Sequence, residues 1–411
     1  MAGQKDILIA GGGASGLLAA VVAARQGARV RVLERMSRVG KKILATGNGR
    51  CNLTNINHSL TRYHGANPDF IRGVIEQFDA NRTIDFFVDL GLLPRLEEEG
   101  KVFPLSEQAS SVLDLLRYEM DRFGVEEICD VRAQAVEQKD GRLALSTTDG
   151  QEFLADAIIV ATGGKSAPNL GSNGGGFKLA KALGHTIIEP FPALVQVNLD
   201  AWFLKRLKGL KLQSAAEVMV DGEMRRSDQG ELLFTDYGIS GPPILQLSRV
   251  VSEFAPKGRD VRLVLDLYPE KEEADLVKMI QDRINRSPEK DMLFSFVGFL
   301  HKRLAPVLLS EAGIRDTKAP ASALSSDAIE KLAHCMKRWE LRCTGVQSWM
   351  NSQVTAGGVD ATELNPQSLE SKKMPGVYFA GEVIDVDGDC GGYNLQWAWS
   401  SGYVAAMHAA Q

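Results

Sequence analysis

The sequence predicts an α/β protein in which a parallel sheet, built from both ends of the chain, is interrupted by a long insertion. Three observations support this fold class. Residues 6–34 show a buried strand, a glycine turn, a helix of small residues and a second strand. Residues 191–266 instead show short β-like runs separated by turn signals. A strand-like segment followed by glycines, residues 374–392, then brings back the first pattern.

The first stretch carries Gly11, Gly13 and Gly16 at the G-x-G-x-x-G spacing. The first glycine permits a tight turn, the second lets a pyrophosphate approach the backbone, and the third allows the helix to pack closely on the strand. The positive end of the helix then faces the phosphates. Glu34 closes the second strand, where its carboxylate can bind ribose hydroxyls and would repel a 2′-phosphate. This stretch therefore predicts a site for FAD or NAD rather than NADP.

The composition is that of an ordinary globular protein. The 411 residues predict two or three domains, and the net charge of −5 gives no overall attraction to nucleic acid, although a local basic patch remains open. We expect no membrane span and no signal peptide. Cys51, Cys129, Cys335, Cys343 and Cys390 form no C-x-x-C pair, so we expect no metal site. The odd count fits a reducing, cytoplasmic location.

The patterns along the chain predict three domains. Residues 1–190 and 346–411 form a discontinuous nucleotide-binding domain. Residues 191–268 and 317–345 form a β-barrel-like domain, and residues 269–316 form a small helical domain. The return of the first pattern near the C-terminus favours FAD over NAD, because FAD is long enough to need it.

Four stretches resemble the BaiN/RdsA-type NAD(P)/FAD-dependent oxidoreductases: KKILATGNGRCNLTN (41–55), ELLFTDYGISGPPIL (231–245), VTAGGVD (354–360) and YFAGEVIDVDGDCGGYNLQWAWSSG (378–402). The resemblance implies an FAD domain of the glutathione-reductase type, a β-barrel-like domain and a small helical domain. It also implies reduction of a carbon–carbon double bond. One branch of the family is similar to the bacterial enzyme that reduces a uridine of 23S ribosomal RNA to dihydrouridine.

The glycine motif and the resemblance together predict the residues that hold the cofactor. Glu382 or Asp385 is expected at the ribityl or pyrophosphate region, with Asp385 favoured, while Asp387 and Asp389 are either part of the site or ordinary surface carboxylates. The expected FAD-binding residues are Gly11, Gly13, Ala14, Ser15, Gly16, Glu34, Arg35, Lys42, Asn48, Val136, Thr162, Gly163, Gly381, Glu382, Asp385, Gly392, Asn394, Leu395 and Gln396.

The expected chemistry passes hydride from NADH or NADPH to the flavin and then to the β-carbon of an enone, which in uracil is C6. An acid delivers a proton to the α-carbon, uracil C5. Cys51, in the glycine-rich basic loop of residues 35–57, is the first candidate acid, and Cys390 is the second. Either thiol can instead be a packing residue, and Tyr393 or water is a further donor. Only one full glycine motif is present, so no separate nicotinamide domain is predicted.

Three functions remain open at this point. The first is reduction of a uridine in ribosomal RNA, the second is reduction of a small enone such as a steroid-like ring, and the third is a non-catalytic, FAD-bound RNA-binding factor. An RNA substrate requires basic residues along a route to the flavin. The candidates, which can also be scattered solvated charges, are Arg38, Lys41, Lys42, Arg50, Lys205, Arg206, Lys208 and Lys211.

Overall fold

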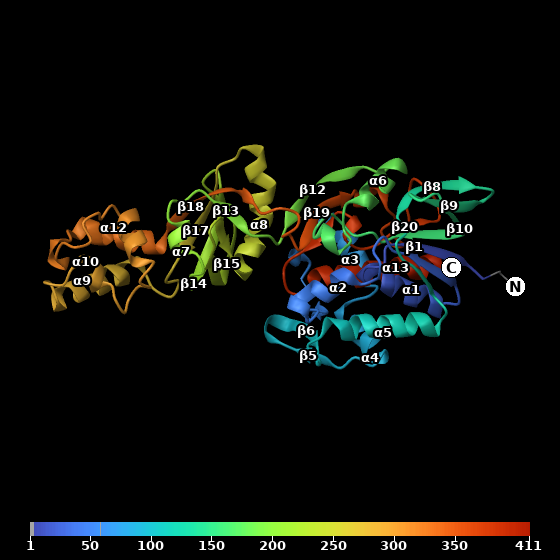
Figure 1. Cartoon of the computed structure of the whole chain (residues 1–411), viewed down its shortest axis with the longest axis horizontal. Helices are drawn as coiled ribbons and strands as arrows, with labels where there is room; N and C mark the ends of the chain where they lie inside the picture. The colour runs from blue at the N-terminus through green and yellow to red at the C-terminus, as the bar shows by residue number, and fades with distance from the viewer. Residues whose placement is uncertain (1–3, 58) are drawn as a thin grey trace. The chain divides into compact units, whose positions relative to one another are not determined.

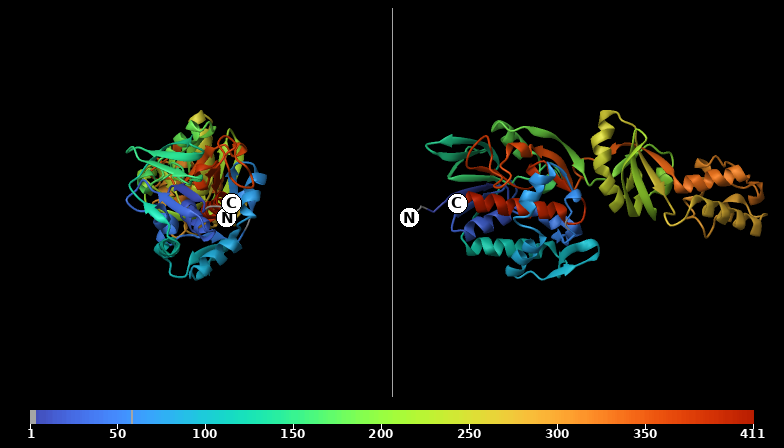
Figure 2. Two further views of the ribbon diagram at one scale, coloured as in Figure 1. Left: turned by 90° about the vertical axis from the view of Figure 1, so that its right-hand side faces the viewer. Right: turned by 180° about the vertical axis from the view of Figure 1, so that it is seen from behind.

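A computed structural model describes residues 4–57 and 59–411, and the chain divides into two compact units (Figure 1). The first unit combines the chain up to Pro192 with Ser348–Gln411, and the second is Ala193–Gln347. The blue segment that begins the described chain and the red segment that ends it both belong to the first unit (Figure 2). The two ends of the chain therefore fold together, and the middle forms a separate unit.

The first unit is built on five parallel strands in the order β20-β11-β1-β2-β7. Their bounds are β20 Val377–Phe379, β11 Ala157–Val160, β1 Asp6–Ala10, β2 Arg29–Leu33 and β7 Glu126–Ile128. Four of the five residues of β1 are buried, and Ile9 pairs with Val32 on one side and Ile159 on the other. This continuous apolar strand is expected for a parallel sheet covered on both faces.

Two hydrophobic clusters cover the two faces of this sheet. Ile7 and Ile9 of β1 pack in one cluster with helical residues of 14–25 and 109–122, and Leu8 and Ala10 pack in the other with the antiparallel strands of 133–155. The first and last helices, α1 (Ala14–Arg25) and α13 (Tyr393–Ala409), pack against each other. Their contact is close, because a Cβ on Gly402 would lie 2.4 Å from the carbonyl oxygen of Ser15. The other helices are α2 Lys41–Ala45, α3 Pro68–Ile75, α4 Ala80–Asp89, α5 Ala109–Arg122 and α6 Gly175–Ala182, with short 3-10 turns η1 Thr46–Gly49 and η8 Gly381–Val383.

Four small sheets complete the first unit. The antiparallel meander β10-β9-β8 turns at Asp140 and Gly141, whose φ angles of 51° and 79° suit a tight hairpin. The strands of the small sheets are β3 Thr54–Asn55, β4 Tyr63–Gly65, β5 Pro94–Leu96, β6 Lys101–Pro104, β8 Ala133–Lys139, β9 Arg142–Thr147, β10 Glu152–Ala155, β12 Ile187–Ala193, β19 Val354–Val359 and β21 Val386–Gly388. Sheet β3-β6-β5 and the pairs β12-β19 and β21-β4 lie outside the meander.

The second unit contains a closed six-strand barrel and a group of helices. The barrel order is β13-β16-β15-β14-β17-β18, with bounds β13 Val197–Leu199, β14 Lys211–Val220, β15 Glu223–Phe234, β16 Gly238–Ser240, β17 Val261–Asp266 and β18 Trp339–Val346. The helices are α7 Leu204–Leu207, α8 Pro242–Phe254, α9 Glu273–Arg286, α10 Met292–Ser295, α11 Ala305–Glu311 and α12 Ser326–Lys337. One hydrophobic cluster runs through the barrel and the helices, so the division into two inserted domains stays a prediction.

Two local expectations can be compared with this structure. The glycine-rich segment 35–57, predicted as a loop, contains the short helix α2 and the turn η1. Among residues 4–57 and 59–411, no helix is both long and apolar enough to cross a bilayer.

Candidate flavin site

The turn between β1 and α1 has the shape that a pyrophosphate requires. A Cβ on Gly16 would lie 1.9 Å from the carbonyl oxygen of Gly11, so this contact requires glycine. Nothing lies within 4 Å of a Cβ built on Gly13, and no side chain caps the first turn, which contains Ala14 and Ser15. The first N–H groups of a helix have no partner within the helix. Open space in front of them therefore fits an anionic ligand.

The end of β2 holds an acid in a fixed position. The Glu34 carboxylate is 8% exposed and accepts hydrogen bonds from the N–H groups of Gly12 at 2.9 Å and Met36 at 2.8 Å. The next residue, Arg35, donates to the carbonyl oxygen of Pro168 at 3.2 Å. Its buried Nε has no hydrogen-bond partner among the described residues. A fixed carboxylate beside an unsatisfied donor fits the ribose end of a dinucleotide.

The carboxyl ends of β11 and β20 meet beside α1. Thr162 follows β11, and its buried hydroxyl is a second polar group without a partner in the described chain. Gly163 has φ 70°, and a Cβ there would lie 2.8 Å from Ser172 Oγ. Gly381, in η8 after β20, donates its N–H to Ser401 Oγ at 2.8 Å. Ligands of open α/β sheets bind at this edge, and the unsatisfied hydroxyl fits a ligand there.

An ion pair joins two predicted cofactor residues that are distant in sequence. Lys42 of α2 lies 2.7 Å from Glu382 of η8, and Glu382 also accepts the N–H of Thr355 at 2.8 Å. Both charged side chains are about a quarter exposed, so they can still reach a ligand. Half-buried Asp385 accepts the N–H of Ala66 at its own carbonyl oxygen. The structure thus brings Lys42 and Glu382 together.

The predicted residues at the start of α13 are used mainly to hold the protein together. The Asn394 side chain exchanges two hydrogen bonds with the backbone of Gly388. Gln396 is 2% exposed and donates to the carbonyl oxygen of Phe78 at 2.9 Å. Leu395 packs on the core. Any cofactor contact of Asn394 and Leu395 must therefore come from their N–H groups at the helix start, which no side chain caps. The N–H of Gln396 already donates to the carbonyl oxygen of Gly392 at 2.9 Å.

Three other predicted residues have simple surroundings. Gly392 precedes α13 with φ 105°, and a Cβ there would lie 2.5 Å from the carbonyl oxygen of Thr54, so this close approach requires glycine. Asn48 is an exposed residue of η1 in the left-handed region. Val136 is buried on β8, an edge strand of the meander, which leaves its backbone to meet a ligand.

The structure does not favour Cys51 as the proton donor. Its thiol is fully buried, and burial raises its pKa to about 12, which makes it a poor acid at neutral pH. Tyr393 donates its hydroxyl proton to the carbonyl oxygen of Asn57 at 3.1 Å, and burial raises its pKa. Cys390 is half-buried beside Gly391 and stays a candidate.

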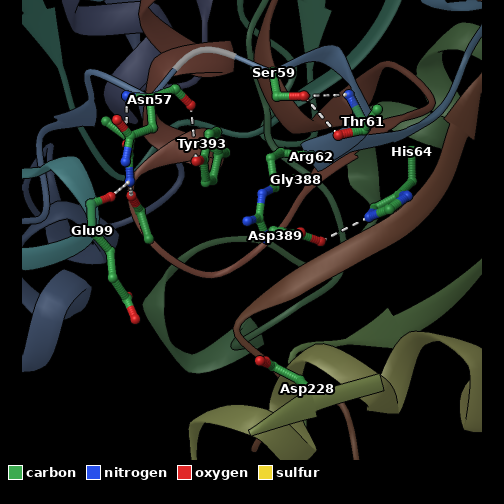
Figure 3. Close-up of polar contacts among 12 residues, drawn as sticks. Asn57, Ser59, Thr61, Arg62, His64, Glu99, Asp228, Gly388, Asp389 and Tyr393 are labelled. Atoms are coloured by element: carbon green, nitrogen blue, oxygen red, sulfur yellow. Dashed lines mark hydrogen bonds and ion pairs between the residues drawn. The ribbon is translucent and has the colours of Figure 1, made fainter. Parts of the chain in front are cut away.

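The reasoning from sequence left Asp389 open as either a site residue or a surface carboxylate, and it missed the partners of this side chain. Asp387 and Asp389 are 1% and 2% exposed, so the surface alternative for them is wrong. The Asp389 carboxylate lies 2.8 Å from His64 Nε2 and 3.3 Å from Arg62 Nη1 (Figure 3). The pairing of β21 with β4 brings these residues together, and nothing in the local sequence of either strand announces it.

The basic residues proposed to lead RNA to the flavin are mostly engaged. Arg50 lies 3.0 Å from Glu97 and stacks over the ring of Phe103. In the second unit, Lys208 pairs with Asp236, Lys211 pairs with Glu231, and Arg206 lies over the exposed ring of Trp202. These pairs reduce the free positive charge of the proposed route.

Residues 5–408 match the family model described as HI0933-like protein Rossmann domain. The chain belongs to this family. It is 40% identical over 410 residues to the 3-dehydro-bile acid delta(4,6)-reductase of Clostridium scindens, covering 99% of this chain and 100% of that one. It is 30% identical to the ribosomal RNA dihydrouridine synthases of Haemophilus influenzae, covering 99% of both chains, and of Escherichia coli, covering 98% of this chain and 97% of that one.

A solved structure shows the same fold. The 3-ketosteroid delta1-dehydrogenase of Sterolibacterium denitrificans matches with a TM-score of 0.50 at 13% identity, and 99% of each chain is covered. The predicted fold class, an FAD-binding Rossmann domain with an inserted barrel, is confirmed. FAD is the cofactor of this oxidoreductase family. The unsatisfied groups and the open glycine turn fit FAD, and the placement of Glu34 and Arg35 at its ribose and of the α1 turn at its pyrophosphate stays a prediction.

Proposed function

We propose that this protein uses FAD and a nicotinamide donor to reduce a ring carbon–carbon double bond conjugated to a carbonyl group. The similarity of the whole chain to a reductase of an unsaturated bile acid, at 40% identity, carries this proposal. The FAD cradle of the first unit supplies the redox group, whose chemistry is hydride transfer. The β-carbon of such a system accepts hydride, and the α-carbon then needs a proton.

As the substrate we propose a uridine of 23S ribosomal RNA, whose C5=C6 bond is conjugated to C4=O. Two relatives of full length carry the name ribosomal RNA dihydrouridine synthase. Trp202 is 54% exposed, with the Arg206 guanidinium 5.2 Å from its ring centroid, and Phe294 is 56% exposed with Lys290 near its ring. Exposed rings beside cations are the groups on which unpaired bases stack.

A steroid-like enone is the second candidate substrate. Identity to the bile acid reductase is ten percentage points higher than to the dihydrouridine synthases, and the ion pairs of Lys208 and Lys211 weaken a purely electrostatic hold on RNA. For this substrate, affinity should depend little on salt. For RNA it should fall steeply with salt, because phosphate contacts release counterions.

The test uses the purified protein loaded with FAD, without oxygen, and with NADH or NADPH. One arm offers protein-free 23S ribosomal RNA from a deletion strain, and the other offers 4-androstene-3,17-dione as a steroid enone. We expect dihydrouridine in the RNA arm, and its absence from the ribosomal RNA of the deletion strain. If the steroid is reduced and the RNA stays unmodified, the substrate is a steroid-like enone and not uridine. Nicotinamide oxidation without either product would overturn reduction of a double bond.

Trp202→Ala separates the two substrates further. Loss of one stacked base should weaken RNA binding by about 1–3 kcal/mol, whereas steroid reduction should be unchanged. Tyr118→Ala is the matched control, because Tyr118 is 70% exposed on α5 of the first unit. Equal RNA affinity in wild type and both variants would contradict a role of Trp202 in RNA binding.

A further inference from the structure

The segment before α13 contains a polar cluster that none of the predicted roles uses. Figure 3 shows His64 and Asp389 pointing toward each other, with Arg62 beside them. The Asp389 side chain is 2% exposed, whereas those of His64 and Arg62 are 23% and 49% exposed. A buried carboxylate needs charged or hydrogen-bonding partners. A partly exposed histidine on such a carboxylate is the usual arrangement of a group that passes protons.

The position of the pair is fixed by backbone contacts. Strands β4 and β21 pair in register, Asp389 donates its N–H to the carbonyl oxygen of Arg62 at 2.8 Å, and Asn394 donates to the carbonyl oxygen of Asp389 at 3.2 Å. Asn394 belongs to the first turn of α13. The carboxylate is therefore tied to the uncapped helix start, where the positive dipole end would stabilise negative charge on a reduced flavin.

We propose that His64, oriented by Asp389, delivers the proton that completes reduction of the double bond. This inference rests on the proposed function, with the reactive ring of the cofactor at the start of α13. Nε2 of His64 lies 2.8 Å from the Asp389 carboxylate, which orients the ring. Asp389 acts as a positioning residue, which holds the imidazole in one orientation.

The step balances in atoms and electrons. Hydride comes from the cofactor, which NADH or NADPH has reduced, and forms a C–H bond at the β-carbon. The electron pair of the double bond moves to the α-carbon, where it takes a proton from the His64 imidazole and forms the second C–H bond. The imidazole then recovers a proton from water through its exposed part.

Three other possible donors near this position, Tyr393, Tyr63 and Cys51, are less suitable. The hydroxyl of Tyr393 donates to the carbonyl oxygen of Asn57, and burial raises the pKa of Tyr63, whose ring packs edge-on against that of Tyr393. Cys51 is fully buried. His64 combines exposure to solvent with a buried orienting carboxylate.

The test compares His64→Gln and Asp389→Asn with the matched control His334→Gln. His334 forms a similar pair with Glu273, 3.0 Å apart, on the surface of the second unit. Stopped-flow absorbance follows two reactions: reduction of bound FAD by the nicotinamide, and its reoxidation by 23S ribosomal RNA or by 4-androstene-3,17-dione. We expect reoxidation to slow about 100-fold in His64→Gln, the range for general acids. Reduction by the nicotinamide should stay as in wild type, and His334→Gln should match wild type in both reactions.

Two further measurements separate proton delivery from a structural role. Added imidazole should restore reoxidation in His64→Ala but not in Asp389→Asn, and the solvent deuterium effect of the wild type should fall in His64→Gln. In the protein without FAD, the ¹⁵N signals of the His64 ring should change in Asp389→Asn and stay unchanged in Glu273→Gln.

The outcomes distinguish this inference from the proposed function. If the wild type reduces RNA or steroid and His64→Gln does so equally fast, the role of His64 is overturned while the function stands. Slow reoxidation in His64→Gln, with no rescue of His64→Ala by imidazole and an unchanged solvent effect, makes His64 structural and also overturns the role. If the wild type reduces neither substrate, the function falls and the role of His64 falls with it.

Discussion

Gly13 and Gly16, three residues apart in the same turn, give the sharpest test of the cofactor site. Gly13 has φ −87°, which alanine adopts without strain, and nothing lies within 4 Å of its built Cβ. Gly16 packs so closely that its Cβ would lie 1.9 Å from the Gly11 carbonyl oxygen. Gly13→Ala should therefore leave the fold intact and fill the space for the pyrophosphate, whereas Gly16→Ala should damage the fold.

The magnitudes follow from these contacts. In the protein without FAD, Gly13→Ala should change the free energy of unfolding by no more than about 1 kcal/mol, in the stabilising direction, because alanine restricts the unfolded chain. Gly16→Ala must move backbone by more than an ångström to reach a normal contact, and overpacking of this kind costs about 1–3 kcal/mol or more. Loss of one or two charge-assisted hydrogen bonds to the pyrophosphate should weaken FAD binding of Gly13→Ala by about 3 kcal/mol, roughly 100-fold.

The assay is calorimetric titration of FAD into the protein freed of flavin, together with urea unfolding of the same samples. The expected pattern is selective loss of affinity in Gly13→Ala and loss of stability in Gly16→Ala. Wild-type FAD affinity in Gly13→Ala would refute the placement of the pyrophosphate in front of α1. Equal destabilisation by both substitutions would refute the contact geometry.

Three further predictions concern the rest of the first unit. Lys42→Met should weaken FAD binding several-fold more than Lys41→Met, because Lys42 pairs with Glu382, a predicted cofactor residue, whereas Lys41 donates to the exposed hydroxyl of Ser37. Fluorescence titration with FAD checks this. Gln396→Leu should cost about 2–4 kcal/mol in urea unfolding, since it leaves the buried Thr83 hydroxyl and Phe78 carbonyl with fewer partners, and Gln77→Leu at a half-buried amide should cost less. Burial lowers the pKa of His185 despite its hydrogen bond to Glu363. The unfolded state therefore takes up the proton first, and the stability of the fold should decrease as the pH drops below about 6.5, the ordinary value. Urea midpoints measured between pH 7.5 and 5.5 check this, and a flat profile would contradict it.

The local parts of the fold could be predicted from sequence because their causes are local. The strand, glycine turn and helix of residues 6–34 follow from periodicity and glycine spacing, and Asp140 with Gly141 follows from hairpin chemistry. The return of the C-terminal segment was visible as a second strand with glycines. Its partner was not visible, because the pairing of Val160 with Phe379 depends on a contact across the whole insertion.

The site was predictable in the same uneven way. Gly13 and Glu34 carry their roles in the spacing of one motif, whereas the side chains of Asn394 and Gln396, expected at the cofactor, turn out to bond the protein itself. A helix N-terminus binds ligands through its backbone N–H groups. A sequence motif identifies the residues at that position, but it does not show whether their side chains or their N–H groups are available to a ligand. Cys51 was favoured because basic residues lie beside it in the sequence. Whether its thiol is exposed depends on tertiary packing, which buries it, and the side chain of Arg50 pairs with Glu97 instead.

Asp389 shows why distant pairing decides the chemistry of such a site. Beside Asp385 and Asp387, it has the sequence context of a solvated acidic loop, and a carboxylate left alone when buried would be protonated or disrupt the fold. It stays buried because His64 of β4 and Arg62, just before that strand, meet it from more than three hundred residues earlier in the chain. The same contact that makes burial tolerable also sets a histidine against a fixed carboxylate. Folding and proton delivery at this position therefore depend on one pair of strands, and substitutions in β4 should affect both.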